Sequence, residues 1–160
     1  MTIKMAAPLE VGICVRDMTR MVDFYTKVLG FAYVSLAEAA KEKSRLSGFT
    51  PSGYEIVRLQ TNYGERIKLN RPVDPPYERS VDAHILDRQG AVYLTFIVNA
   101  LDEMVASLKK AGVPVLPTEG TVEVRPGVRL CTAKDPEGNH LEFVEYADIS
   151  IYRNDLSGET

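Results

Sequence analysis

EVGICVRDMTRMVDFYTKVLGF, residues 10–31, is matched later in the chain by YLTFIVNALDEMVASLKKAGV, residues 93–113. Glu10 falls on Tyr93 and Val15 on Val98, a constant offset of 83 (93 − 10 and 98 − 15). Each copy begins with apolar residues at alternate positions, which predicts a strand. Each then has apolar residues at helical spacing before a glycine, which predicts an amphipathic helix with a glycine end. The first helix should begin at Asp17, a good N-cap.

A second pair of segments repeats at an offset of 74. In residues 54–71 and 128–145, Gly64 falls on Gly138 and Lys68 on Glu142 (138 − 64 and 142 − 68). Both segments read as a strand, a turn and a second strand. Each half also has room for one more strand, near 31–36 and 113–117. The repeated unit is therefore a strand, a helix and three strands.

These repeats divide the chain into four predicted parts. We expect a first module at 7–72, a linker or flap at 73–90, a second module at 91–146 and a tail at 147–160. Residues 37–50 are an insertion in the first module, in which AEAAKEKSRL could form a short helix. The tail has no clear assignment from its pattern.

Bulk properties exclude several classes of protein. The chain has 160 residues, 45% hydrophobic and 26% charged, which is typical of a soluble globular domain. A net charge of −3 gives no reason to expect nucleic acid, and no apolar stretch predicts a membrane span. Cys14 and Cys131 fall in strand-like runs and are expected to be buried free thiols, which fits a cytoplasmic protein.

Strand alternation predicts a second, polar surface opposite the apolar one. It is either the solvated side of an ordinary sheet or the concave side of a half-closed barrel of eight strands. In the first module this surface should hold Glu10, Gly12, Cys14, Arg58, Arg66, Lys68 and Asn70. In the second it should hold Tyr93, Thr95, Ile97, Thr132, His140, Glu142 and Val144.

The run VRDMTRMVDFYTKVLGF and the later run RPGVRLCTAKDPEGNHLEFVE resemble the vicinal oxygen chelate superfamily over roughly residues 7–146. Glyoxalase I, extradiol dioxygenases, methylmalonyl-CoA epimerase and the bleomycin- and fosfomycin-resistance proteins belong to it. The resemblance implies an α+β fold in which paired βαβββ modules form an eight-stranded open barrel. It also implies a cup with a divalent metal at its base.

The family takes its metal ligands from the first and last strands of each module. Carried over, those positions are Glu10, Lys68, Tyr93 and Glu142. Many metal-dependent members have histidine where this chain has Glu10 and Tyr93, and a protonated lysine cannot bind a metal. We therefore expect no cofactor. A divalent metal retained on Glu10 and Glu142 is the minor alternative.

Three readings of these residues stay open. One carboxylate acts as a general base while Lys68 or Tyr93 stabilises an oxyanion, as in lyase, isomerase or ring-cleaving chemistry. Alternatively the charges form a structural plug, or the protein binds and sequesters a small molecule, as bleomycin-resistance proteins do. The ligand-contact candidates are His140, Arg58, Arg66, Thr95 and Cys14. Since cups in this family are often completed by a second chain, we also expect a homodimer.

Overall fold

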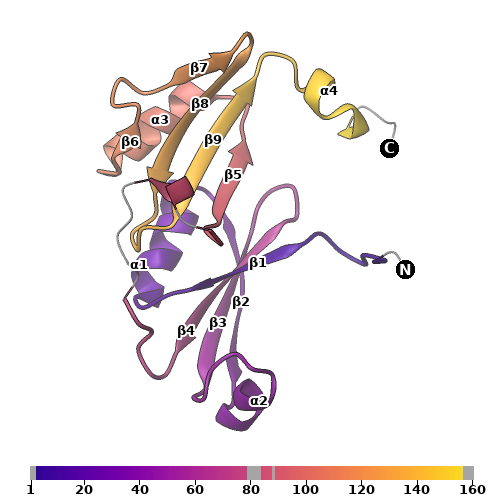
Figure 1. Cartoon of the computed structure of the whole chain (residues 1–160), viewed down its shortest axis with the longest axis vertical. Coiled ribbons are helices and arrows are strands. Elements are labelled where there is room, and N and C mark those ends of the chain that lie inside the picture. Colours follow the sequence, from indigo (N-terminus) through magenta and orange to yellow (C-terminus); the bar gives the residue numbers. More distant parts are fainter. Residues whose placement is uncertain (1–2, 79–83, 88, 157–160) are drawn as a thin grey trace. The chain divides into compact units, whose positions relative to one another are not determined.

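The computed structural model describes residues 3–78, 84–87 and 89–156. The chain forms two compact units, residues 1–80 and 81–160. Each unit has a sheet of its own, and both sheets are drawn in Figure 1. The described part of the predicted linker 73–90 includes a short 3-10 helix, Ile85–Asp87. Residues 79–83 and 88 of that linker, and 157–160 of the tail, lie outside the described residues.

The first unit has a four-stranded sheet with the strand order β1-β4-β3-β2. β1 runs parallel to β4, and β3 runs antiparallel to β4 and to β2. The predicted strand after the first helix and the predicted short helix are both present, as β2 and α2. The elements are β1 (Glu10–Cys14), α1 (Met18–Asp23), η1 (Phe24–Val28), β2 (Ala32–Ala39), α2 (Lys41–Leu46), β3 (Tyr54–Gln60) and β4 (Arg66–Pro72).

The second unit has a five-stranded sheet with the order β5-β9-β8-β6, and β7 pairs with β8. β5 runs parallel to β9, as β1 does to β4 in the first unit. The elements are β5 (Tyr93–Ile97), α3 (Leu101–Lys110), β6 (Val115–Leu116), β7 (Val122–Arg125), β8 (Val128–Lys134), β9 (His140–Tyr146), α4 (Ile149–Tyr152) and η3 (Asn154–Leu156).

The predicted α+β fold with a duplicated strand-helix-strand order is confirmed. In the first unit Glu10 is the register partner of Arg66, and in the second Tyr93 is the partner of His140. These pairs are related by the same offsets, 83 and 74, that align the two halves of the sequence. The second module differs in one respect, because β7 adds a fourth strand after the helix among the described residues. The exact module boundaries stay a prediction.

The alternation of each strand fixes which side chains are buried. The buried strand residues include Ile13, Val57, Leu59, Ile67 and Leu69 in the first sheet and Val115, Val128, Cys131, Ala133, Leu141 and Phe143 in the second. Side chains between them, such as Lys68 and Glu142, are half-buried on the opposite face. The facing prediction is therefore confirmed for these strands. Val144 is an exception, since it belongs to the polar set but is 5% exposed.

The two cysteines differ in their surroundings. Burial raises the pKa of the Cys131 thiol, as expected for a core residue. Cys14 is exposed, so the prediction that it is buried was wrong. It is the last residue of β1 and lies in the polar set of that strand, where alternation puts it on the open side of the sheet. No helix in the described part of the chain is long and apolar enough to cross a membrane.

Candidate functional site

The polar face of the first sheet is built from rows of side chains that cross neighbouring strands. The central row runs from Gly12 on β1 through Lys68 and Arg58 to Ser35 on β2. The flanking rows are Glu10, Arg66 and Gln60 on one side, and Cys14, Asn70 and Ile56 on the other. We call these residues the first polar face. It contains the seven residues that alternation predicted for this surface, five of which are catalytic or ligand-contact candidates: Glu10, Cys14, Arg58, Arg66 and Lys68.

Glu10 carries the negative charge of this face and is held by two cations. Its carboxylate lies 3.6 Å from the Lys68 ammonium and 3.7 Å from the Arg66 guanidinium. Arg66 also donates a hydrogen bond from Nε to Gln60 Oε1 at 2.7 Å. The side chains of all three ionic partners are between 32% and 38% exposed, so solvent screens these pairs. Lys68 therefore pairs with Glu10 within the first sheet.

The polar face of the second sheet centres on Glu142. The Thr95 hydroxyl donates a hydrogen bond to Glu142 Oε2 at 2.7 Å, and Thr132 is the register partner on the other side. Tyr93 and His140 are partners in the next row. The four catalytic or ligand-contact candidates of this module, Tyr93, Thr95, His140 and Glu142, therefore lie on one face, and Thr95 is the direct partner of Glu142. We call Tyr93, Thr95, Thr132, His140, Glu142 and Tyr146 the second polar face.

Tyr146 and Tyr152 are residues of this region that sequence reasoning missed. Their rings are stacked, with centroids 4.4 Å apart and planes at 13°. Burial, together with a hydrogen bond to Tyr152, raises the pKa of Tyr146. Tyr146 continues the alternation of Glu142 and Val144, so its face was readable from the pattern. Nothing in the sequence indicated that Tyr152 on α4 would stack on it.

The donor set at the four ligand positions does not fit a transition metal. Lys68 offers an ammonium, which has no lone pair for a metal, and its charge already pairs with Glu10. Tyr93 offers a phenol, a weak ligand unless deprotonated. Among the described residues, no group of three or more His, Cys, Asp or Glu side chains lies close enough together to hold a metal ion.

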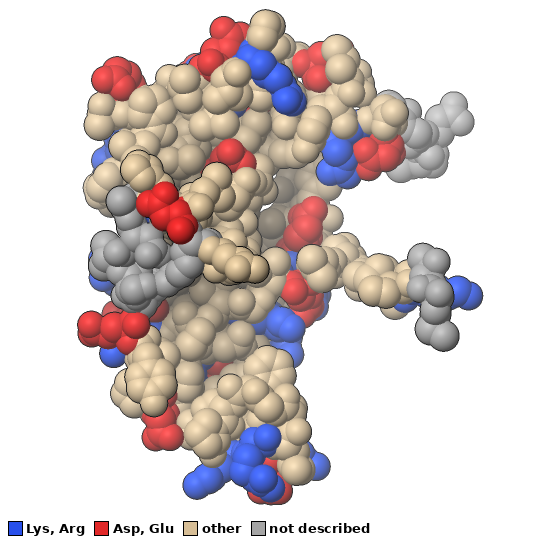
Figure 2. Space-filling model, viewed as in Figure 1, with Lys and Arg blue, Asp and Glu red and all other residues tan. Residues whose placement is uncertain are grey.

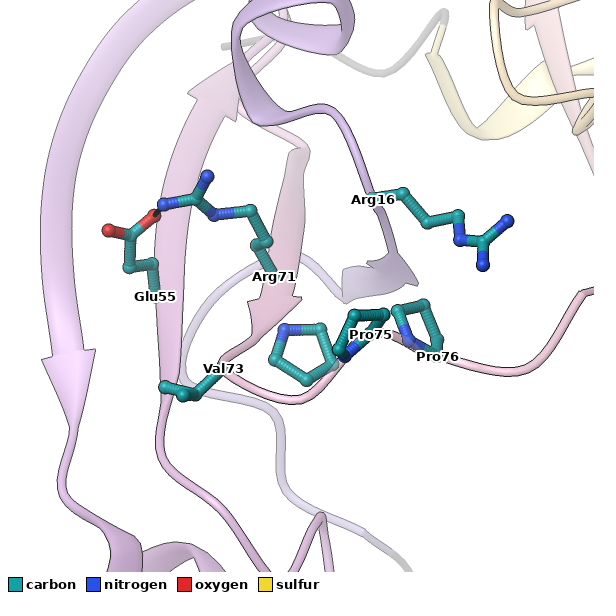
Figure 3. Close-up of a pocket in the computed structure, with 7 residues that line it drawn as sticks. Arg16, Glu55, Arg71, Val73, Pro75 and Pro76 are labelled. Carbon is teal, nitrogen blue, oxygen red and sulfur yellow. Dashed lines mark ion pairs between the residues drawn. The ribbon is translucent and has the colours of Figure 1, made fainter.

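One pocket among the described residues lies away from the first polar face. It has a volume of about 500 Å³ at the end of β4, and Figure 3 shows Arg71 turned toward Glu55 and Arg16 pointing the other way. Each arginine has an acidic partner: Arg71 lies 2.7 Å from Glu55 and Arg16 lies 3.1 Å from Glu78. The remaining lining residues are Pro72, Val73, Pro75 and Pro76. The charges of this pocket are therefore neutralised within the protein.

A second pocket, of about 360 Å³, lies in the second unit. Arg129 lines it and is paired with Asp102 and Glu145, and the contact with Asp102 raises the pKa of Arg129. Glu145 also accepts a hydrogen bond from the Leu101 backbone N–H at 3.2 Å, at the start of α3. These charges therefore stabilise the packing of α3 on the sheet.

Charge on the visible surface is mixed (Figure 2). Lysine and arginine side chains of α2 (Lys41, Lys43 and Arg45) gather at one end of the first unit. Elsewhere on the face shown, acidic and basic groups are interspersed among the described residues. This surface does not have the continuous basic strip that a nucleic-acid partner would need.

Solved structures of other proteins share this fold. The family model described as the Glyoxalase/Bleomycin resistance protein/Dioxygenase superfamily matches residues 7–143. A solved glyoxalase family protein from Bacillus cereus is similar at 25% identity and a TM-score of 0.73, covering 91% of this chain and 97% of that one. The trypanothione-dependent glyoxalase I of Leishmania major is similar at 19% identity and a TM-score of 0.60, covering 93% and 92%. No protein of curated function matches.

Proposed function

Because the chain belongs to the glyoxalase/bleomycin resistance protein/dioxygenase superfamily, we propose that it is a small-molecule enzyme of the lyase, isomerase or ring-cleaving type. The observation that carries this proposal is the hydrogen bond from Thr95 to Glu142. It fixes one carboxylate oxygen on a half-buried, open sheet face. A positioned carboxylate of this kind can accept a proton from carbon next to a carbonyl group.

The two oxygens of Glu142 have different tasks in this proposal. Oε2 is held by Thr95, and Oε1 accepts no hydrogen bond from any residue that the structure describes. Oε1 is therefore available to take the substrate proton. Tyr93 lies two positions from Thr95 on the same strand, and its hydroxyl can donate to the oxyanion that develops on the carbonyl.

Glu10 and Lys68 form the other proposed catalytic pair. The Lys68 ammonium, 3.6 Å from the Glu10 carboxylate, is the positive charge that this face can offer to an anionic intermediate. Because the donor set does not fit a metal, no step of this mechanism depends on one. His140, Arg58, Arg66, Thr95 and Cys14 keep their proposed role as ligand contacts.

Hydrogen–deuterium exchange at carbon tests the proposal without knowledge of the full reaction. Small carbonyl compounds, including α-hydroxy ketones, thioesters and the hemithioacetals that glyoxalases use, are incubated with the protein in D₂O and followed by proton NMR. We expect the protein to accelerate exchange next to the carbonyl for one class. Glu142→Gln should lower that rate by about 100-fold or more, in the range of a lost general base.

The matched control is Glu103→Gln on the exposed face of α3, which removes the same charge. Its exchange rate should equal that of the unaltered protein. Equal rates for Glu142→Gln and the unaltered protein would refute the role of Glu142.

A second candidate function is the binding or sequestration of a small molecule, and the Tyr146–Tyr152 stack favours it. Stacked rings supply a rigid apolar surface for a planar ligand at the edge of the second polar face. This function predicts tight binding of a compound with no exchange at carbon. It also predicts that Tyr152→Ala weakens binding while Glu142→Gln leaves it nearly unchanged.

A further inference from the structure

Arg58 stands out on the first polar face because it has no carboxylate partner among the described residues. It is half-buried, and its guanidinium donates a hydrogen bond from Nη1 to the Ser35 hydroxyl at 3.5 Å. That distance is long for a hydrogen bond. A guanidinium has five N–H donors, so most of its capacity is unused.

The neighbour of Arg58 makes this arrangement unfavourable without a further group. Lys68 is the register partner of Arg58 on β4, and both side chains lie on the same face of the sheet. Like charges directly opposite each other on paired strands destabilise a sheet. Glu10 relieves part of the repulsion, but it is also shared with Arg66. This face therefore has three cations for one carboxylate among its described residues.

The row that contains Arg58 has no side chain at its β1 end. Its β1 position is Gly12, which is exposed and has no side chain. A Cβ built at Gly12 would come within 3.1 Å of the Asn70 side-chain nitrogen, which is tighter than ordinary contact. The glycine thus lets the Asn70 amide lie over β1, beside Lys68. Asn70 Nδ2 donates to the Lys68 carbonyl at 3.2 Å, and an amide nitrogen has a second N–H.

From these contacts we propose that Arg58, Lys68 and the Asn70 amide bind an anionic group, a carboxylate or a phosphate. The planar donors of Arg58 suit two oxygens of such a group, and the Lys68 ammonium supplies charge from the next strand. The anion completes the hydrogen bonding of Arg58 and separates it from Lys68. The inference that the substrate of the enzyme is an organic anion rests on the proposed function. The inference that this face binds an anion does not depend on the proposed function.

NMR titration of the ¹⁵N-labelled full chain tests the site with two probes, pyruvate and inorganic phosphate. Saturable shifts are expected at the backbone amides of the central row, Ser35, Arg58 and Lys68. Arg58→Gln should weaken binding about tenfold or more, as expected for the loss of charged hydrogen bonds. Preference for pyruvate would assign the site to carboxylates, and preference for phosphate to phosphoryl groups.

Two control variants identify the place of binding. Arg45→Gln removes an exposed arginine paired with Glu42 on α2 and should leave the affinity unchanged. Arg71→Gln removes one of the two arginines of the proline-lined pocket and should also leave the affinity unchanged. Loss of binding in Arg71→Gln, with Arg58→Gln unaffected, would overturn the proposal and move the anion to that pocket.

Two further variants, Arg58→Lys and Glu142→Gln, distinguish loss of folding and loss of the proposed reaction from loss of the anion site. Arg58→Lys retains the charge and should fold even where Arg58→Gln does not; it should bind more weakly than the unaltered protein because the planar fork is lost. Glu142→Gln should retain anion binding, so a failure of the exchange assay with intact binding would count against the proposed reaction alone. Absence of saturable shifts in the unaltered protein would refute the anion site itself.

Discussion

At the scale of single residues, the Lys68 ammonium is the positive charge next to Glu10 on the first polar face. It holds Glu10 and competes with any metal that the carboxylate could bind, since two unit positive charges about 4 Å apart repel by about 4 kcal/mol at an effective dielectric of about 20. We predict that Lys68→Glu creates weak affinity for Mn²⁺, Ni²⁺ or Zn²⁺, because two carboxylates would then face each other. Calorimetric titration of both proteins measures this difference.

Lys110→Glu is the control for that titration. It makes the same change of charge in the last turn of α3, away from Glu10 in the sequence and in the other unit. It should bind no more metal than the unaltered protein. The prediction is wrong if the unaltered protein already binds one of these ions at sub-micromolar affinity.

The strand face of each candidate site residue was predictable, but the pairing of these residues was not. Alternation assigned Glu142 and Thr95 to one face because side chains of a strand point to opposite sides with a period of two. Their hydrogen bond depends on the register between β5 and β9, which are joined by a long crossover. Register across such a connection is set by packing in three dimensions, which a single sequence pattern does not contain.

At the scale of elements, the first helix was only partly predictable from the sequence pattern. The prediction that it begins at Asp17 is confirmed, since the Asp17 side chain accepts a hydrogen bond from the Arg20 backbone N–H. The predicted amphipathic helix is present, but only its first part is α-helical. A π-helical segment, Phe24–Val28, follows α1 and brings the adjacent residues Phe24 and Tyr25 both into the core. Such a wider turn is rare and has no sequence signature.

The short helix α4 gives a prediction for the C-terminal tail. Asp148 caps it by accepting hydrogen bonds from the Ser150 backbone N–H and hydroxyl, and these contacts lower the pKa of Asp148. Asp148→Ala should loosen α4 and release Tyr152 from Tyr146. The pKa of Tyr146, raised in the folded protein, should then fall toward the ordinary tyrosine value of 10.0. Absorbance titration of the tyrosines would detect this shift.

The same cap makes the tail sensitive to acid. A carboxylate with a lowered pKa stabilises the fold fully above its ordinary value of 3.8, and this stabilisation is lost as the pH falls through the lowered value. Asp148→Asn should keep the cap without the acid transition, because asparagine is a good N-cap that does not titrate in this range. Hydrogen exchange at the backbone amides of Ser150 and Arg153 measures the capping. If exchange in Asp148→Ala is as slow as in the unaltered protein, the capping role of Asp148 is contradicted.

At the scale of the whole molecule, the duplicated architecture was readable from the repeat alone. Two offsets, 83 and 74, aligned strands that turned out to be register partners in each unit. The additional strand β7 was missed because residues 122–125 have no counterpart in the repeat, and their pattern VEVR is short. The tail was missed because four residues cannot show helical periodicity, and the stack of Tyr152 on Tyr146 stabilises it instead.

The tail also provides the prediction about assembly. Ile151 on α4 is 84% exposed, although the adjacent Tyr152 packs on Tyr146. We predict a homodimer in which Ile151 is buried against the second copy. A two-fold interface uses the same patch on both subunits, so it would bury Ile151 of each copy. Burial of an isoleucine contributes about 1.5–3 kcal/mol, so Ile151→Asp should shift the equilibrium strongly toward the 17.8 kDa monomer. Ile3→Asp is the matched control, since Ile3 is 82% exposed near the other end of the chain. Sedimentation velocity at micromolar concentration measures all three proteins, and a 17.8 kDa species alone for the unaltered chain would contradict the dimer.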